Sequence, residues 1–342
     1  MGISSFPISF LLAATPLPVE PVEAPAIGPV STPVVAPVPM AMEEGAYRQV
    51  LQSGDLATLD GACRDAARFG LNERMRELRD RLMVVAPAPQ PFTVVTANAR
   101  ALLECRAPDS AQRVLSRYGP GAGARRREWL LLSWRAAAAA LDHDAATLAL
   151  RRLADGQVAR LETMQLVVGE GAEGLPLTRS ALDQLAEHEA AAGRIERAAA
   201  VALSGVSMGR VGAERMARAA LWLEALGQHD ATNLLEAALD QAAVAEAWAL
   251  AEELLRLQLR LERKSGGDGA RPRSRLERLA TRVDDRYTLW QLLRGDSSQP
   301  VADPRRADLE QRLRSPRSPG GWSSLGQSEQ PGASRPISPL NP

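Results

Sequence analysis

The stretch "LEALGQHDATNLLEAAL", from Leu223 to Leu239, contains the pattern that decides the fold. Apolar residues recur three and four positions apart on both sides of "GQHDA", which predicts two helices joined by a short turn. Gly227 suits the end of the first helix. Asp230 suits the start of the second, because its carboxylate can accept hydrogen bonds from the free N–H groups of the first turn. We interpret His229 as an exposed neighbour of this cap rather than as a catalytic group.

The same pattern recurs along the chain and predicts a series of helical hairpins. "AALDHDAATLALRRL" (139–153) contains His143 and Asp144, and Asp55 and Asp109 also stand at expected helix starts. The expected helices are 42–53, 56–68, 73–85, 95–105, 109–118, 124–141, 145–154, 179–192, 195–204, 213–226, 231–241, 243–263 and 275–294. Ser274 and Glu277 have the spacing of a capping box for the last of them.

Composition favours an all-α protein. Of the 342 residues, 45% are hydrophobic and only 4% aromatic, and alanine and leucine, both good helix formers, dominate the apolar set. The 41 basic residues balance the 41 acidic ones, so we expect no DNA partner and no global attraction to RNA or to an anionic membrane. We expect Cys63 and Cys105 to be buried, inert thiols, with a disulfide between them as the alternative.

Both ends of the chain differ from the middle. Residues 1–41 read as a proline-rich, disordered tether, and the apolar segment within 1–15 is too short to span a bilayer and only weakly resembles a signal peptide. A cytoplasmic location is therefore favoured, with export to the periplasm as the alternative. Residues 295–342 are rich in Arg, Ser and Pro and are expected to be disordered, apart from one short helix to about Arg314. Arg305, Arg306, Arg312 and Trp322 are the candidate partner-binding residues of this tail.

The spacing of two turns suggests a repeat. Gly193 and Gly227 lie 34 residues apart, the period of tetratricopeptide (TPR) repeats. Over about 60 residues the chain resembles that family at Leu182, Leu185, Ala186, Gly193, Ala198 and Ala202. It departs from the family at Glu189, where an aromatic residue is usual, and at Gly205, where alanine is usual. The resemblance implies stacked antiparallel helical hairpins in an α-solenoid, a fold that binds peptides or protein surfaces and rarely catalyses.

This interpretation divides the chain into seven segments. They are the tether 1–41, an N-terminal hairpin plus helix 42–85, a linker 86–94, TPR-like repeats 95–264, a linker 265–273, a C-terminal helix 274–294 and the tail 295–342.

Few residues suggest chemistry. Gly169, Gly171 and Gly174 form G-x-G-x-x-G within 166–175, but Pro176 follows where a dinucleotide site needs a helix, so we interpret the segment as a loop between repeats. His143 and His229 should lie about 20 Å apart from the spacing of packed helices, and His188 falls on a different helix. Each histidine is therefore expected to act alone or with its neighbouring aspartate. The arginines of "ARRRE" (124–128) are interpreted as a solvated face. No catalytic, cofactor-binding or metal-binding residue is assigned.

The sequence thus predicts a non-enzymatic helical-repeat scaffold with a protein or peptide partner and no cofactor. Two alternatives stay open. One is a nucleotide- or metal-dependent regulator or enzyme that uses the glycine loop 169–174. The other is an arginine-lined, RNA-binding solenoid.

Overall fold

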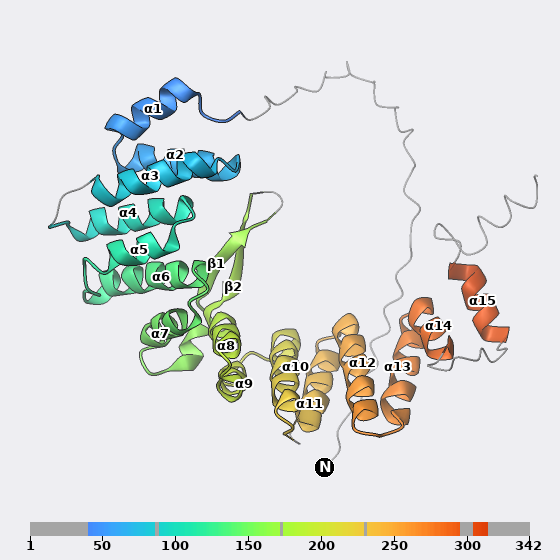
Figure 1. Ribbon diagram of the computed structural model, residues 1–342. Coiled ribbons are helices and arrows are strands. Elements are labelled where there is room, and N and C mark those ends of the chain that lie inside the picture. The colour runs from blue at the N-terminus through green and yellow to red at the C-terminus, as the bar shows by residue number, and fades with distance from the viewer. Residues whose placement is uncertain (1–39, 86–88, 172–173, 229–230, 295–303, 314–342) are drawn as a thin grey trace, which may run out of the picture. The chain divides into compact units, whose positions relative to one another are not determined.

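The computed structural model describes residues 40–85, 89–171, 174–228, 231–294 and 304–313. All of these except Met40 and Ala41 belong to one unit, residues 42–342. Within the described ranges the chain forms fifteen α-helices, one short 3-10 helix and one β-hairpin (Figure 1). The expected all-α class is therefore confirmed except for the hairpin.

The helices before the hairpin are α1 (Glu44–Ser53), α2 (Leu56–Arg68), α3 (Asn72–Val84), α4 (Phe92–Glu104), α5 (Pro108–Leu115), α6 (Gly123–Ala139) and α7 (His143–Ala154). The 3-10 helix η1 (Val158–Leu161) leads into β1 (Gln165–Glu170) and β2 (Pro176–Ser180). The helices that follow are α8 (Ala181–Ala191), α9 (Ile195–Leu203), α10 (Gly209–Ala225), α11 (Ala231–Val244), α12 (Trp248–Lys264), α13 (Ala270–Arg282), α14 (Arg286–Arg294) and α15 (Pro304–Leu313).

Packing is local along the chain. The main contacts between helices join neighbours in chain order, as in α6 with α7 or α10 with α11, or helices separated by one other, as in α2 with α4. Three successive apolar cores result, centred on α1–α6, on α6–α9 and on α10–α13. Each contains several alanines, and small side chains let the helix axes approach closely. The chain therefore builds its interior from neighbouring segments rather than around one central core.

The turn residues confirm part of the predicted pattern of helix starts and ends. Asp55 caps α2, since its carboxylate accepts a hydrogen bond from Thr58 N at 2.9 Å. Gly193 and Gly227 follow α8 and α10 with φ angles of +78° and +72°, a region that favours glycine. At α7, however, the cap is Asp142, which accepts from Ala145 N at 3.0 Å, and Asp144 lies in the first turn.

Two further aspartates, Asp109 and Asp230, are expected from the sequence to cap helices, and neither is confirmed as a cap. Asp109 also lies inside a first turn, because Pro108 already begins α5. Proline favours a first helical position, where its missing N–H would have no partner in the helix. His229 and Asp230 lie outside the described residues, so the cap expected there stays a prediction.

The helix predicted over 275–294 is two helices, so that prediction is wrong. Asp284 has a φ of +53°, which ends α13, and the Asp285 carboxylate accepts from Tyr287 N and Thr288 N at 3.1 Å to start α14. Ser274 and Glu277 lie inside α13 and form no capping box, because α13 already starts at Ala270. The linker expected over 265–273 is correspondingly shorter.

One helix of the tail belongs to the described residues. Residues 304–313 form α15, as the expected short helix required, and α15 packs against α14. Trp290 Nε1 donates to Glu310 Oε1 at 3.1 Å, and Arg306 forms an ion pair with the same carboxylate. The short helix expected within the tail is therefore confirmed, while Trp322 lies outside the described residues.

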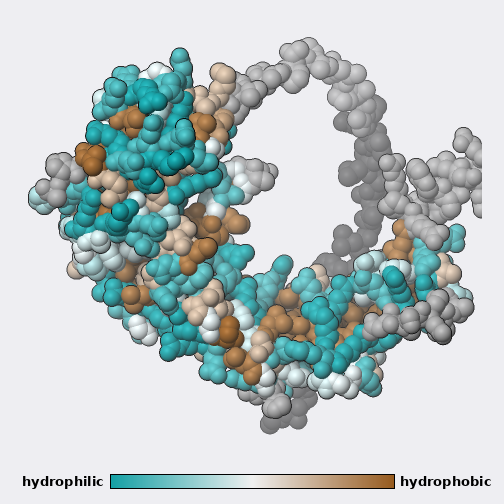
Figure 2. Space-filling model, viewed as in Figure 1, coloured by the Kyte–Doolittle hydropathy of each residue, from teal (hydrophilic) through white to brown (hydrophobic). Residues whose placement is uncertain are grey.

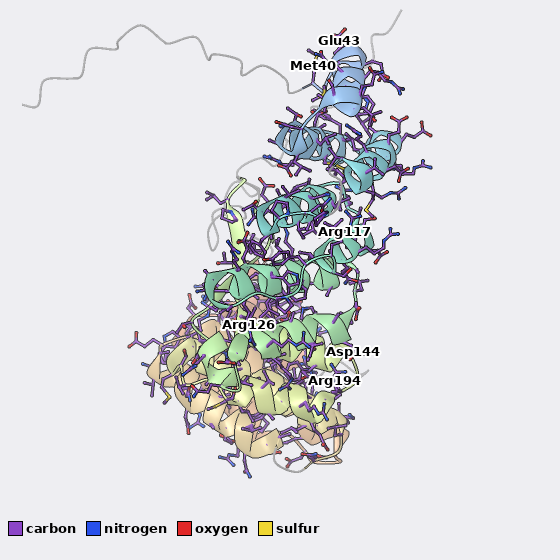
Figure 3. All side chains as sticks on the ribbon, turned by 90° about the vertical axis from the view of Figure 1, so that its left-hand side faces the viewer. Met40, Glu43, Arg117, Arg126, Asp144 and Arg194 are labelled. Carbon is purple, nitrogen blue, oxygen red and sulfur yellow. A yellow bond between two sulfur atoms is a disulfide. The ribbon has the colours of Figure 1, made fainter. Side chains whose placement is uncertain are left out.

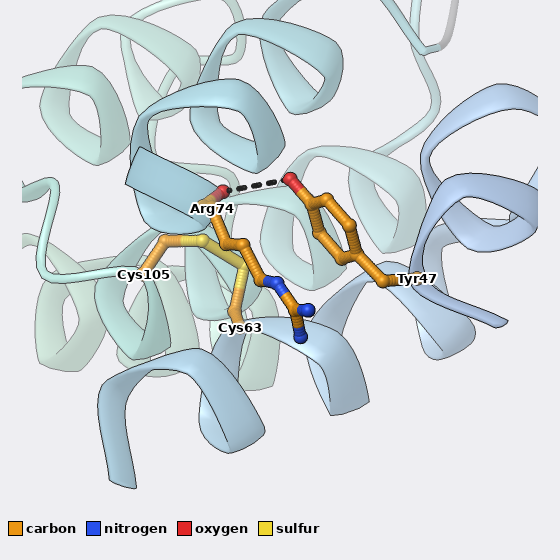
Figure 4. Close-up of a disulfide and its surroundings, with 4 residues drawn as sticks. All are labelled: Tyr47, Cys63, Arg74 and Cys105. Atoms are coloured by element: carbon orange, nitrogen blue, oxygen red, sulfur yellow. Dashed lines mark hydrogen bonds between the residues drawn. A yellow bond between two sulfur atoms is a disulfide. The ribbon is translucent and has the colours of Figure 1, made fainter. Parts of the chain in front are cut away.

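The two cysteines form a disulfide, so the expectation of free thiols is wrong (Figure 4). Cys63 of α2 and Cys105, just after α4, are both buried and have Cα atoms 4.6 Å apart. Sequence spacing gave no signal because the bond depends on the packing of α2 against α4. Closing a loop with a sequence separation of 42 residues stabilises the fold by about 4 kcal/mol when the effect is assigned to chain entropy.

Tyr47 packs in the same core and ties α1 to α3. Its hydroxyl donates to Glu77 Oε2 at 2.5 Å and lies 3.4 Å from the Arg74 carbonyl oxygen (Figure 4). The Arg74 guanidinium stands 4.5 Å from the centre of the Tyr47 ring.

Candidate functional site

The β-hairpin is the one departure from helix in the described chain. β1 and β2 are antiparallel, with Val167 opposite Thr178, Gly169 opposite Leu177 and an irregularity between Val167 and Gly169. Gly171 N donates to the Leu175 carbonyl oxygen at 2.8 Å, and Gly174 adopts a φ of +74° in the turn. Valine and threonine favour strands, which gives a local reason for the hairpin.

This geometry corrects the interpretation of the glycine motif. Gly169 lies in β1, Gly171 and Gly174 lie in the turn, and a second strand follows. A dinucleotide site needs a helix N-terminus at that point, to place N–H groups against the pyrophosphate. The expected loop between repeats is also replaced, since most of 165–180 is paired strand.

A buried ion cluster fixes the base of the hairpin. Glu162, between η1 and β1, accepts hydrogen bonds from Val206 N at 2.8 Å and Ser207 N at 3.0 Å. Its carboxylate also binds the Arg215 guanidinium, whose Nε donates to Asp183 Oδ1 at 2.8 Å. Arg215 and Glu162 are only 5% and 8% exposed. The cluster therefore joins the hairpin to the starts of α8 and α10.

The ionised form of Glu162 is the stable one at neutral pH. Burial by itself raises the pKa of this carboxyl. The hydrogen bonds from Ser207, Val206 and Arg215 outweigh burial and lower the pKa to about 2.

Gly205 makes room for this cluster. A Cβ atom added there would lie 2.5 Å from Arg215 Nη1 and 3.1 Å from Glu162 Oε1. Arg215 is held on both sides and cannot easily move away. The glycine that departs from the TPR pattern is thus explained by the buried arginine beside it.

An open cleft of about 560 Å³ lies between the hairpin and the helices. Its helical wall consists of Trp134, Arg135, Ala138 and Ala139 of α6, with Glu104 of α4 and Gln184 of α8. Its other wall contains Val167, Val168, Gly169 and Glu170 of β1, with Gly174 of the turn and Pro176 of β2. Because both strands contribute residues, the outer half of the hairpin forms this wall.

The hairpin exposes apolar side chains. Val167, Val168, Leu175 and Leu177 are 54%, 37%, 64% and 51% exposed. Apolar surface is visible in Figure 2 where Figure 1 shows the hairpin. In the described chain each strand has only the other as its partner, so the outer edge of each is unpaired. Exposed apolar groups beside an unpaired strand edge are typical of a surface that another chain covers.

Behind the cleft, two histidines meet, contrary to the expectation that each acts alone. Trp134 Nε1 donates to His188 Nε2 at 3.2 Å, and His188 Nδ1 lies 3.1 Å from His143 Nδ1. An indole N–H only donates, so His188 Nε2 must be unprotonated. The proton of neutral His188 then sits on Nδ1 and is donated to His143. His143 is accordingly a half-buried partner of α8 rather than a solvated turn residue.

Protonation of His188 is disfavoured by its surroundings. Burial, and to a smaller extent the neighbouring His143, lowers the pKa of this imidazole to about 4. A second proton on Nε2 would also face the Trp134 N–H. The chain Trp134–His188–His143 is therefore assembled with His188 neutral.

Glu189 is a second buried carboxylate beside the histidines. It is fully buried and accepts from Arg151 of α7 and from Arg194 of the α8–α9 turn. Arg194 also binds Asp144, and both are labelled in Figure 3. Burial raises the pKa of Glu189, but hydrogen bonds from Arg194 and Arg151 outweigh it, so the pKa stays below its usual value. The carboxylate that replaces the expected aromatic residue thus joins two helical units.

The predicted tail arginines lie elsewhere. Arg306 and Arg312 of α15 form ion pairs with Glu310 and Asp308 of the same helix, and Arg305 belongs to it too. The structure does not bring them to the cleft wall. Within the described ranges, no group of three or more His, Cys, Asp or Glu side chains could hold a metal ion. No helix there is long and apolar enough to cross a membrane.

Comparison of the chain with family models, with curated proteins and with solved structures finds no match in any of the three.

We expect Glu162→Gln to lower the free energy of unfolding by about 3 kcal/mol, because it leaves the buried Arg215 without the charge that it binds. Urea denaturation at pH 7 measures the loss. The stability from Glu162 is present above about pH 4.5 and is lost as pH falls toward 2, since its pKa is lowered in the folded state. The matched control is Glu214→Gln, which breaks the exposed pair with Arg210 on α10 and should cost under about 1 kcal/mol. Equal losses in the two variants would contradict the role given to Glu162.

We also expect the free energy of unfolding to fall by up to about 3 kcal/mol between pH 7 and pH 4 through His188 alone. The unfolded chain takes up a proton on this residue near pH 6.5, whereas the folded chain resists until about pH 4. His188→Gln cannot titrate, so its stability should vary less across that window. Denaturation curves at half-unit pH steps give the comparison, and because both proteins keep Glu162, its loss of stability below about pH 4.5 cancels in the difference. Parallel curves for the two proteins would rule the assignment out.

Proposed function

We propose that the protein is a non-enzymatic scaffold of TPR-like helical repeats that binds an extended segment of a partner protein in the cleft beside the hairpin. The observation that carries this proposal is the cleft between Trp134 and two alanines on one wall and, on the other, the hairpin, whose strand β1 has an unpaired edge in the described chain. A peptide strand can pair with such an edge through main-chain hydrogen bonds while its side chains enter the cleft.

The helical framework supports the scaffold proposal. Contacts run mainly between neighbouring helices, as in repeat proteins whose units contact only the next unit. The two glycines that are 34 residues apart both end first helices of hairpins. Such a framework offers a long surface on which a rigidly anchored hairpin can act as one side of a binding site.

Selection of peptides tests the proposal. We expect extended peptides selected from a random displayed library against the intact chain to bind it, and Val167→Lys to weaken them by at least about tenfold. A lysine on the strand edge opposes pairing and removes apolar contact. Leu221→Lys on α10, at 43% exposure against 54% for Val167, is the control and should leave binding unchanged. Circular dichroism confirms that both variants fold. Peptides that bind both variants equally, or a selection that yields none, would count against the cleft.

We further propose that the protein works in an oxidising compartment, the exported alternative of the sequence analysis. The disulfide between two buried cysteines supports this, because such bonds persist where thiols are not kept reduced. We expect both cysteines to resist thiol alkylation in protein taken from its native cells by acid quenching, and to react after reduction and unfolding. Mass spectrometry reads the result. Alkylation of both before reduction would instead indicate a reducing compartment.

A further inference from the structure

Positive charge is concentrated near the end of the helical region. Residues 256–294 contain eleven basic and five acidic residues, although the whole chain is neutral. These residues belong to α12, α13 and α14, which pack in succession. The excess is therefore a local property of three neighbouring helices.

Four arginines of this region line one pocket of about 190 Å³. Arg256, Arg260 and Arg263 come from one side of α12, at spacings of four and three residues, and Arg273 comes from α13. The remaining lining residues are Leu259, Leu276, Thr288, Gln291 and Leu292. No acidic side chain belongs to the lining.

Three of the four arginines, Arg256, Arg260 and Arg273, retain capacity to bind a ligand. Arg256 binds Glu252, Thr288 and Gln291, and Arg273 binds the Leu292 carbonyl oxygen, all through a single nitrogen, Nη2. Each guanidinium carries five N–H donors, so most donors of these two side chains have no partner among the described residues. Arg260 is exposed and has no hydrogen-bond or ion-pair partner in the described chain.

The positive charge of this arginine-lined pocket favours the binding of an anion. Arginine stays charged at any physiological pH, so the four side chains cannot relieve their repulsion by losing protons. Glu252 offsets part of the charge from outside the lining. Leu259, Leu276 and Leu292 make part of the lining apolar. The resulting low local dielectric strengthens the attraction between the arginines and a bound anion.

We propose that the pocket between α12, α13 and α14 binds a phosphate group, either as the free ion or as the monoester of a small molecule. Guanidinium forks match the oxygen spacing of phosphate and form two parallel hydrogen bonds with it. The volume lies below the roughly 300–1,000 Å³ of pockets for drug-sized ligands, which suits a small group. The lining contains no aromatic ring, so it lacks the stacking surface that single-stranded nucleic acids use. This site is separate from the cleft beside the hairpin.

Isothermal titration calorimetry of the full chain tests the proposal, with sodium phosphate at pH 7.5 and ionic strength held constant by sodium chloride. We expect saturable binding that Arg260→Gln weakens by about tenfold or more, since a charge-assisted hydrogen bond is lost. Arg278→Gln on α13 is the matched control, because this arginine is exposed and lies outside the pocket lining. It should bind phosphate like the unchanged protein.

A second titration, with glycerol 3-phosphate, distinguishes the two sources of the group. Tighter binding of the ester indicates that the pocket takes the phosphate of a larger molecule, and tighter binding of inorganic phosphate indicates the free ion. The proposal is overturned if neither ligand gives saturable binding, or if Arg260→Gln and Arg278→Gln bind phosphate equally well.

Discussion

The buried pair of Glu162 and Arg215 is the interaction on which the candidate binding cleft depends. The hairpin interrupts a run of helices that otherwise pack on their neighbours, and two strands alone are barely stable in water. Glu162 at the entrance of the hairpin reaches Arg215 of α10 and the N–H groups of Val206 and Ser207. At the hairpin's exit, the Arg215 guanidinium lies near Ser180 and binds Asp183. One guanidinium therefore holds both ends of the insertion, and the rest of the hairpin can stay exposed without losing its position.

Buried ion pairs of this kind add little net stability, but they are satisfied in only one arrangement of the packed helices. Removing two ions from water is costly, and apolar residues of similar size often stabilise a fold as well or better. Glu189, enclosed by Arg151 and Arg194, repeats the arrangement at the joint between α7, α8 and the following turn. Alanine-rich helices can slide past one another with little change in contact area, whereas an ion pair is satisfied in one register only. We infer that these two carboxylates fix the register of helices whose apolar faces specify it weakly.

Most of the helical framework could be predicted from the sequence, because apolar periodicity and caps act within a few residues. Helix α2 and its cap Asp55 are examples, and so are the glycines at 193 and 227. The errors concern contacts between distant segments or competition between adjacent residues. Asp142 and Asp144 offer equal capping chemistry, and the backbone selects the first. The disulfide joins α2 to the end of α4, and His143 of α7 contacts His188 of α8 although the hairpin separates them in sequence, so neither follows from local spacing. The exposed strands lack the buried alternation that identifies a strand, so the glycine pattern by itself predicts a loop.

The neutral net charge of the chain is the sum of a negative N-terminal part and a positive C-terminal part. Residues 1–255 contain 24 basic and 31 acidic residues, whereas residues 256–342 contain 17 basic and 10 acidic ones, so net charges of −7 and +7 cancel. Solution electrostatics acts over about 10 Å at moderate salt, and α12 packs mainly against α11 and α13. A ligand near α12 therefore meets the local excess of arginine and not the average of the chain. A balanced composition therefore argues against a global attraction to anions but not against a local one, because the helices of this chain contact mainly their near neighbours.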